Sequence, residues 1–254
     1  MDRKIRIGAV SYLNTKPLIY GLEEAPIRDE IELVVDYPAH IAAMLADDRI
    51  DIGLVPVAII PELAESHIVT DYCIACDGAV ESVAIFSEVP MDEIRTVLLD
   101  YQSRTSVMLA RILLRDYWKK DILLVDTMGE EFRHQIQGDV AGVVIGDRAL
   151  RQKKESRYMY DLGQAWKEHT GLPFVFAAWI SNKPIPTDFI ALFNEANAKG
   201  LQQLDLIIAR ETDPPANLME YYTKFIKYEL TAEKRQGLLH FLSLLKTYNT
   251  QVSL

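Results

Sequence analysis

The chain has 254 residues, a formal net charge of −10 and a hydrophobic content of 49%, enough for one large α/β domain or two smaller lobes. The acidic balance excludes nucleic acid as the expected partner, because phosphate binding needs clustered Lys and Arg. No apolar run approaches the roughly 20 residues of a membrane span and MDRKIRIGAV does not read as a secretory signal, so we expect a cytoplasmic protein with no membrane partner.

The first third of the chain predicts a β-α-β-α-β unit. Apolar periodicity marks the strands and helices, and Pro17 suits the first turn of a helix. In chain order the predicted elements are a strand at 5–10, a polar turn and helix start at 11–22, a strand at 30–38, a helix at 39–50 and a strand at 51–60 that breaks at Pro56.

The same order recurs from residue 94. The predicted elements are a strand at 94–100, a polar turn at 101–106, a helix at 107–118, a strand at 121–127, a helix at 130–138 and a strand at 141–146 that runs into a helix. Two series of the same plan predict two α/β lobes of similar topology, with a cleft between them.

The remaining segments connect and complete these lobes. Residues 73–93 form a pair of extended segments, and residues 160–186 predict a strand, a short helix and a strong strand that returns to the first lobe. Residues 186–211 predict one amphipathic helix, and residues 216–247 predict two more, with Thr231 as an N-cap. We expect these helices to pack on the first lobe, which gives lobe one as 1–88 plus 180–254 and lobe two as 89–179.

Cysteine and histidine do not predict a metal or redox site. Cys73 and Cys76 form a CIAC sequence, but this segment reads as a strand, in which positions three apart point to opposite faces. We therefore expect two core or half-buried thiols. The five histidines show no metal-ligand spacing, and the chain has neither a nucleophile elbow nor a glycine-rich phosphate loop. We expect no metal and no cofactor.

Two polar turns are the candidate binding elements. Each follows the first strand of its series, and ligands of α/β folds bind at the carboxyl ends of strands. The polar side chains expected to bind substrate are Ser11, Tyr12 and Thr15 in the first turn, and Ser103, Arg104, Thr105 and Ser106 in the second.

Two interpretations of these turns are open. Ser, Thr and Asn at helix starts often serve only as caps, each contributing about 1 kcal/mol. A cap needs one such residue, however, whereas the second turn offers three hydroxyls beside an arginine. We therefore interpret the pair as sites for a small ligand with two anionic groups. Asp147, after the strand at 141–146, either faces the same ligand or is an N-cap.

Several motifs, in this order, resemble the chorismate dehydratase family of the futalosine route to menaquinone. They are GAVSYLNTKPLIYGL, DIGLVPVAII, DGAVESVAIFS, LLDYQSRTSVMLARILL, VVIGDRAL and DLGQAWKEHTGLPFVFAAW. The resemblance implies the two-lobed α/β fold of type II periplasmic binding proteins, with a central cleft. The related 1,4-dihydroxy-6-naphthoate synthase family usually opens with a Cys-Pro-Asn-Asp-Thr turn, whereas this chain has SYLNTKP, which favours the dehydratase.

The resemblance implies a lyase that removes water from chorismate to give 3-[(1-carboxyvinyl)oxy]benzoate. Chorismate carries two carboxylates, one for each polar turn. Asn14 and Ser82 are then the candidate catalytic residues, as hydrogen-bonding partners of the reacting groups. The turns contain no obvious base, so the substrate's own side-chain carboxylate is the expected proton acceptor. For Ser82 an alternative stays open, since a strand serine is often satisfied by backbone alone.

Two other functions fit the same pattern. A non-catalytic binding protein for small carboxylates should carry a signal peptide or a lipid-attachment cysteine. The effector-sensing half of a transcription regulator should carry a helix-turn-helix before the first strand. Neither feature is found in this sequence. The oligomeric state is not predicted.

Overall fold

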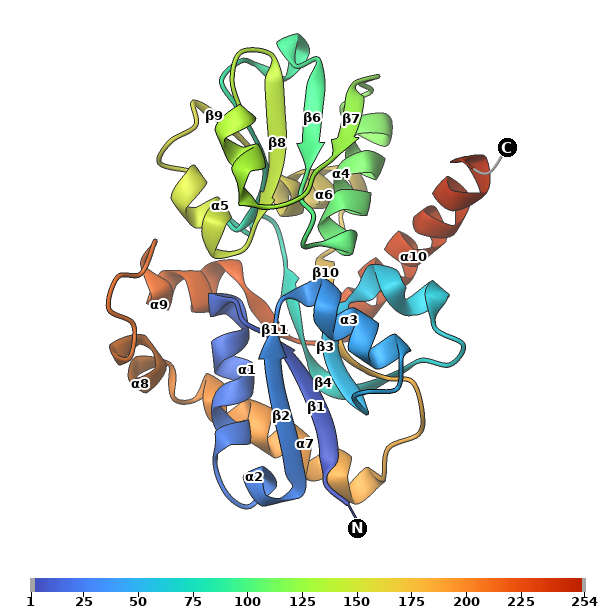
Figure 1. Cartoon of the computed structure of the whole chain (residues 1–254), viewed down its shortest axis with the longest axis vertical. Coiled ribbons are helices and arrows are strands. Elements are labelled where there is room, and N and C mark those ends of the chain that lie inside the picture. Colours follow the sequence, from blue (N-terminus) through green and yellow to red (C-terminus); the bar gives the residue numbers. More distant parts are fainter. Residues whose placement is uncertain (1–2, 253–254) are drawn as a thin grey trace. The chain divides into compact units, whose positions relative to one another are not determined.

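The computed structural model describes residues 3–252, which form two units. The first unit contains the residues up to Ala75 together with Val175–Ala232. The second contains Cys76–Phe174 and the residues from Glu233 onward. Each unit is built around its own β-sheet (Figure 1).

The first unit has a six-stranded sheet in the order β11-β4-β10-β3-β1-β2. Its central strands β1 and β3 are parallel, β2 runs parallel to β1, and β10 is antiparallel to β3. The strands are β1 (Ile5–Val10), β2 (Ile31–Asp36), β3 (Ile52–Pro56), β4 (His67–Cys76), β10 (Phe174–Ser181) and β11 (Lys227–Glu229).

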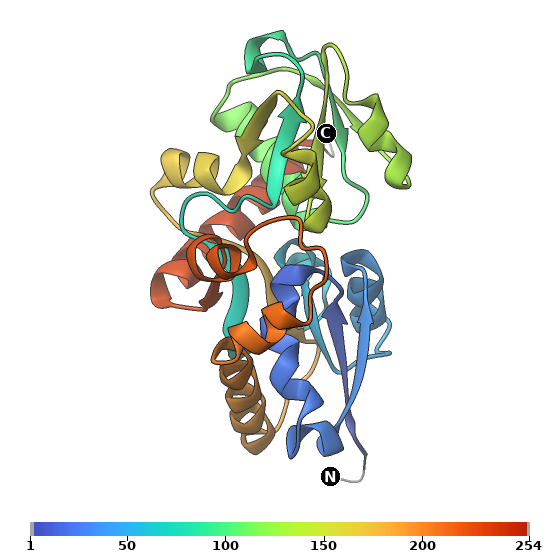
Figure 2. The same ribbon diagram turned by 90° about the vertical axis from the view of Figure 1, so that its left-hand side faces the viewer.

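Helices cover both faces of this sheet. Figure 2 shows α1 and α7 together on one face, while α3 packs against Gly8 and Gly53 on the other through Ile41. The helices of this unit are α1 (Lys16–Tyr20), α2 (Ile27–Glu30), α3 (Pro38–Ala46), α7 (Thr187–Leu201), α8 (Leu204–Ala209) and α9 (Leu218–Glu220).

The second unit has a five-stranded sheet in the order β7-β6-β8-β5-β9. β6 runs parallel to β7 and β8, whereas β5 is antiparallel to β8 and β9. The strands are β5 (Val83–Ser87), β6 (Thr96–Leu99), β7 (Leu123–Asp126), β8 (Val140–Ile145) and β9 (Tyr158–Asp161). The helices are α4 (Arg104–Asp116), α5 (Asp147–Gln152), α6 (Leu162–Thr170) and α10 (Ala232–Val252).

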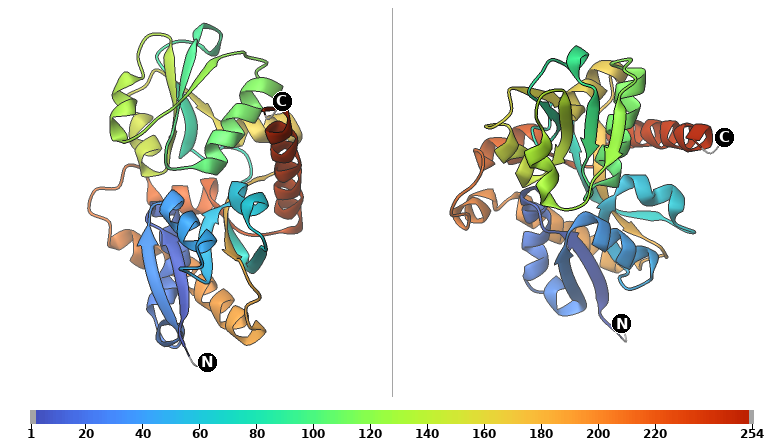
Figure 3. Two further views of the ribbon diagram at one scale, coloured as in Figure 1. Left: turned by 45° about the vertical axis from the view of Figure 1, so that its right-hand side comes forward. Right: turned by 45° about the horizontal axis from the view of Figure 1, so that its top comes forward.

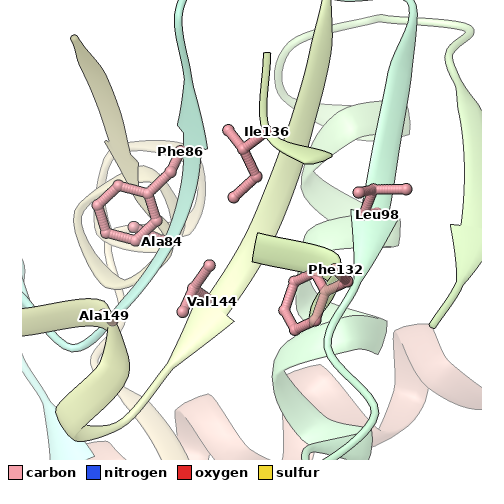
Figure 4. Close-up of a cluster of buried hydrophobic side chains, with 7 residues drawn as sticks. All are labelled: Ala84, Phe86, Leu98, Phe132, Ile136, Val144 and Ala149. Atoms are coloured by element: carbon pink, nitrogen blue, oxygen red, sulfur yellow. The ribbon is translucent and has the colours of Figure 1, made fainter. Parts of the chain in front are cut away.

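The core of the second unit lies on both faces of its sheet. On one face, a cluster of buried side chains joins the strands to a 3-10 segment at Glu130–Gln135 and to α5 (Figure 4); its members are Ala84, Phe86, Leu98, Phe132, Ile136, Val144 and Ala149. Elsewhere in the unit α10 lies beside α6 (Figure 3). There the Phe241 ring contacts the rings of Trp166 and Phe174 edge to face. Such aromatic pairs stabilise a core beyond the area they bury.

The sequence predicts two series of strands and helices in the same order, and the structure confirms this prediction. The parallel order β2-β1-β3 of the first sheet matches β7-β6-β8 of the second. In each sheet the next strand is antiparallel, β10 in the first and β5 in the second. The two predicted series therefore form separate sheets with equivalent strand orders.

The boundaries between the units differ from those predicted. The predicted first lobe runs to residue 88, but β5 pairs with β8 and β9 of the second sheet. It also includes residues 180–254, whereas the chain from Glu233 onward belongs to the second unit. The reason is burial: Phe86 of β5 and Phe241 of α10 are both 0% exposed in the second unit's core.

Three smaller predictions are also corrected. The single helix predicted at 186–211 is broken into α7 and α8. The predicted helix at 130–138 is only a 3-10 segment. Between the last two helical segments the chain inserts β11, whose three residues are too short to show a strand periodicity.

Candidate functional site

The first polar turn follows directly from β1. The Ser11 N–H donates to the carbonyl oxygen of Asp36 at 3.1 Å, which continues the pairing of β1 with β2 by one residue. A 3-10 turn at Leu13–Thr15 then leads into α1, with Pro17 in the first turn of that helix as predicted. The turn thus lies at the carboxyl end of a central parallel strand, where α/β folds bind ligands.

Asn14 lies inside this 3-10 turn and is not a helix cap. The N-cap residues, Tyr12 for the turn and Thr15 for α1, make no side-chain capping bond. The capping interpretation of the first turn is therefore wrong. Among residues 3–252, the one hydrogen bond of the half-buried Asn14 side chain is a long one, from the Thr15 hydroxyl to Oδ1 at 3.4 Å. The amide is thus held loosely by its surroundings.

Two further contacts join the turn to distant segments of the chain. The phenol of Tyr228 donates to the carbonyl oxygen of Asn14 at 3.0 Å. Lys16, the lysine of this turn, forms an ion pair with Glu211.

The second polar turn is a capped helix start. Ser103 is the N-cap of α4: its Oγ accepts the Ser106 N–H at 3.1 Å and donates to the Ser106 Oγ at 2.9 Å. The capping interpretation is therefore confirmed for Ser103. Thr105 and Ser106 are buried, 1% and 2% exposed, whereas Arg104 is exposed. Arg104 is thus the residue of this turn most open to an incoming anion.

A buried ion pair that the sequence did not reveal supports this turn. Asp100 follows β6, and both of its carboxylate oxygens accept from the Arg148 Nη2, at 3.0 and 2.9 Å. The same carboxylate accepts the N–H groups of Gln102 and Ile145. Burial raises the pKa of Asp100, while the Arg148 charge and these N–H groups act in the opposite direction. The pair joins the ends of β6 and β8.

Ser82 lies just before β5 and is completely buried. Its hydroxyl donates to the Val80 carbonyl oxygen at 3.4 Å, and its own carbonyl accepts the Gly146 N–H at 2.8 Å. The hydrogen bond to the Val80 carbonyl oxygen fits the alternative interpretation of Ser82, in which backbone atoms alone satisfy its hydroxyl.

Asp161 is a second residue that sequence reasoning missed. Its carboxylate accepts the N–H groups of Val80, Glu81 and Gln164, so it both caps α6 and holds the loop before Ser82. Burial raises the pKa of Asp161, against the effect of these N–H groups. The sequence signal for it is an Asp three residues before Gln164 at a helix start, which predicts a cap but not the loop contact.

Asp147 is the first residue of α5 and is half-buried. The N-cap of this helix is Gly146, whose φ of 64° lies in a region that favours glycine. The N-cap interpretation of Asp147 is therefore wrong.

Within the second unit, topology brings the predicted polar residues to one edge of the sheet. Because β5 runs antiparallel to β8, the start of β5 lies opposite the end of β8, with Val83 paired to Ile145. Ser82, Asp147 and the turn after β6 therefore share this edge. In the first unit, the turn at 11–16 alone carries the predicted residues.

Other candidate sites receive no support. Cys73 and Cys76 are both buried, as predicted. Within the described chain, no three His, Cys, Asp or Glu side chains are grouped so that they could hold a metal ion. None of the helices in residues 3–252 combines the length and hydropathy needed to cross a bilayer.

The sequence is similar to known proteins over nearly its whole length. The family model for menaquinone biosynthesis matches residues 5–247. The chorismate dehydratase of Thermus thermophilus is 26% identical, over 92% of this chain and 93% of that protein. The chorismate dehydratase of Campylobacter jejuni is 24% identical, over 95% and 98%.

Solved structures agree on the fold. A protein of Archaeoglobus fulgidus superposes with a TM-score of 0.75 at 11% identity, over 97% of this chain and 98% of that one. A Candida albicans protein described as having the generic periplasmic binding protein fold superposes with a TM-score of 0.63 at 12% identity, over 96% and 90%. The chain therefore has the two-lobed α/β fold of periplasmic binding proteins, as predicted.

Proposed function

This chain belongs to the menaquinone biosynthesis family, and on that premise we propose that it is a chorismate dehydratase. Such an enzyme is a lyase that converts chorismate into 3-[(1-carboxyvinyl)oxy]benzoate and water. The observation that carries the proposal is the nearly full-length alignment, over more than nine-tenths of each chain, with two chorismate dehydratases of different bacteria.

The chemistry asks little of the protein beyond positioning and charge stabilisation. Loss of water makes the substrate ring aromatic, so the driving force lies in chorismate itself. The proton that leaves sits on the ring carbon bearing the enolpyruvyl ether, and the electrons left behind are conjugated to the ring carboxylate. Hydroxide then leaves from the neighbouring carbon as the last ring double bond forms. An enzyme accelerates such a step by holding donors where negative charge develops.

Asn14 is proposed as the catalytic residue of the first unit. A neutral amide can donate to one substrate oxygen and accept from another, without placing a charge beside a dianion. Support comes from its half-buried side chain, its loose hydrogen bond to Thr15 and the absence of a capping role. Ser82 is proposed as its counterpart in the second unit, because it lies just before β5, at the edge of the sheet that also carries the turn after β6.

The two polar turns are proposed to bind the carboxylates. In the first unit the proposed residues are Ser11, Tyr12 and Thr15. In the second, Arg104 lies exposed at the start of α4, a helix of 13 residues whose N-terminus favours an anion. Ser103, Thr105, Ser106 and Asp147 complete the proposed set on that unit.

We assign the base to the substrate. The first turn has no His, Asp or Glu, and Lys16 is paired with Glu211. The enolpyruvyl carboxylate of chorismate is then the proposed acceptor of the ring proton.

The test is incubation of the purified protein with chorismate, followed by ultraviolet absorbance and mass spectrometry. The proposal expects an aromatic product lighter than chorismate by one water molecule, formed without added cofactor and absent after heat inactivation. A product of unchanged mass indicates a rearrangement, and one that has lost pyruvate indicates a different lyase; either contradicts the proposal. Binding of chorismate without turnover supports the non-catalytic carboxylate-binding protein instead.

A further inference from the structure

The Asn14 turn is tied to a segment far away in the sequence. Tyr228, in β11 and 214 residues along the chain, donates its O–H to the Asn14 carbonyl oxygen at 3.0 Å. The Tyr228 side chain is only 6% exposed. A buried donor that loses its partner is costly, so this bond fixes the phenol and the carbonyl relative to each other.

The backbone around Tyr228 departs twice from regular geometry. Residues Tyr221–Phe225 form a π-helical turn, closed by a bond from the Ile226 N–H to the Tyr221 carbonyl at 3.0 Å. In the pairing of β11 with β4, the register shifts between Lys227 and Glu229, the two neighbours of Tyr228. π-turns and bulges of this kind re-aim side chains and recur next to functional sites.

We propose that Tyr228 is a positioning residue that sets the direction of the Asn14 side chain, an inference that rests on the proposed function. The reason is that the Asn14 amide has little restraint of its own, since its bond from Thr15 is long, at 3.4 Å. The direction of its Cα–Cβ bond then depends on the backbone of the turn. Tyr228 fixes that backbone at the carbonyl of the same residue.

The phenol is suited to this task over the whole working range of pH. Burial raises the pKa of Tyr228 well above its ordinary value, and the neighbouring Tyr221 and Tyr222 raise it further. Tyr228 therefore keeps its proton, and a carbonyl oxygen can only accept. The hydrogen bond from Tyr228 to Asn14 therefore does not change with pH.

The test is a double-mutant cycle of Tyr228→Phe and Asn14→Ala, with steady-state kinetics on chorismate. Tyr228→Phe keeps the ring and removes only the donor. We expect turnover to fall about fivefold, the factor that corresponds to one ordinary hydrogen bond, with KM nearly unchanged. In the Asn14→Ala background the same substitution should change nothing further, because Tyr228 acts through Asn14.

Tyr72→Phe is the matched control, because Tyr72 lies on β4 opposite Glu229 and loses the same group. It should leave turnover unchanged. Equal losses from Tyr228→Phe in both backgrounds, or unchanged turnover in a folded Tyr228→Phe protein, would overturn the proposal.

A second readout does not depend on activity. The side-chain amide resonance of Asn14, identified by its loss in the spectrum of Asn14→Ala, should shift in Tyr228→Phe and stay in place in Tyr72→Phe. An unshifted resonance in Tyr228→Phe contradicts the positioning role. If wild-type protein leaves chorismate unchanged, the proposed function fails, while this resonance still decides whether Tyr228 positions Asn14.

Discussion

At the scale of single residues, substitutions of two asparagines should affect turnover and stability differently. Asn14 caps no helix, whereas the Asn217 Oδ1 accepts the Glu220 N–H at 3.2 Å and caps α9. We expect Asn14→Ala to lower turnover of chorismate about a hundredfold to a thousandfold, as for other donors aimed at transition-state charge, with little change in melting temperature. Asn217→Ala should do the reverse, costing about 1 kcal/mol of stability and no turnover.

Asn14→Asp extends this comparison. It places a charge of nearly the same shape beside a dianionic substrate, so binding and turnover should both fall. Thermal melting and steady-state kinetics of the three variants provide the measurement. A stable Asn14→Ala protein with normal turnover would contradict the proposed catalytic role of Asn14.

The two cysteines should be dispensable for chemistry. Cys73 and Cys76 are each 0% exposed, and Gly163 lies against the Cys76 sulfur, where an added Cβ would approach to 2.5 Å. We expect Cys73→Ala and Cys76→Ala each to cost about 1 kcal/mol of stability, with turnover within about twofold of wild type. Loss of turnover in a double variant that still melts cooperatively would contradict this packing role.

The sequence predicts some of these residue roles and misses others for a physical reason. Ser103 was recognisable as a cap candidate because a cap and its helix are local. Asp100 and Arg148 are 48 residues apart, so their pairing follows from β6 lying beside β8 and not from any motif. Asn14 has a residue type common at caps, and only its place inside the 3-10 turn shows that it is not one.

At the scale of elements, the contact of α7 with α1 determines how the first turn is supported. Gly200 of α7 lies so close that an added Cβ would sit 1.8 Å from the Pro17 carbonyl oxygen. That atom belongs to the backbone and cannot move alone. We expect Gly200→Ala to destabilise the protein by about 3 kcal/mol, measured as a lower urea midpoint.

Glu195→Ala, at an exposed position of the same helix, is the control and should change stability by less than about 0.5 kcal/mol. An unchanged urea midpoint for Gly200→Ala would show that α7 can move away from α1 at no cost.

Element boundaries were predicted where periodicity is strong. The strands β1, β2, β3 and β6 and the helix α3 lie where apolar patterns place them. The division of 186–211 into two helices was not visible, since the residues at the break, Gln202 and Gln203, are good helix formers. The short β11 was missed because it is defined by its pairing with β4.

At the scale of the whole molecule, the repeated strand order is the feature that sequence predicted best. Both parallel series lie in separate sheets, and the fold is that of periplasmic binding proteins. The predicted boundaries placed β5 and α10 in the wrong unit because strand pairing and packing decide where each belongs: β5 pairs with β8 and β9, and α10 joins the second unit after the chain has passed through the first. An apolar face indicates burial but not the unit in which it is buried.

An acid-sensitive network stabilises the first unit. Burial of Asp51 acts to raise its pKa, but hydrogen bonds from Arg3, Arg6 and Lys183 outweigh this and hold the pKa well below its usual range. A lowered folded pKa contributes stability above the unfolded value, near pH 4, that is lost as the pH falls toward the folded value. We expect Asp51→Asn to cost about 2 kcal/mol at pH 7, because the buried carboxylate loses its charge-assisted hydrogen bonds, while its cationic partners Arg3, Arg6 and Lys183 stay partly exposed.

The difference between wild type and Asp51→Asn should narrow below about pH 4. Urea midpoints measured at neutral and acidic pH provide the test. Asp29→Asn, at a position 68% exposed in its side chain, should show almost no difference at either pH. An Asp51→Asn difference that stays constant with pH would contradict the network's dependence on the ionised carboxylate.

The most direct test of the central claim is proton NMR of chorismate incubated with the wild-type protein. The account predicts that the signal of the ring proton beside the ether disappears while aromatic signals of a meta-substituted benzoate grow in equal amount, with the enolpyruvyl methylene signals retained. Retained ring-proton signals after prolonged incubation, or loss of the enolpyruvyl methylene signals as pyruvate is released, would contradict the assignment of chorismate dehydration to this protein.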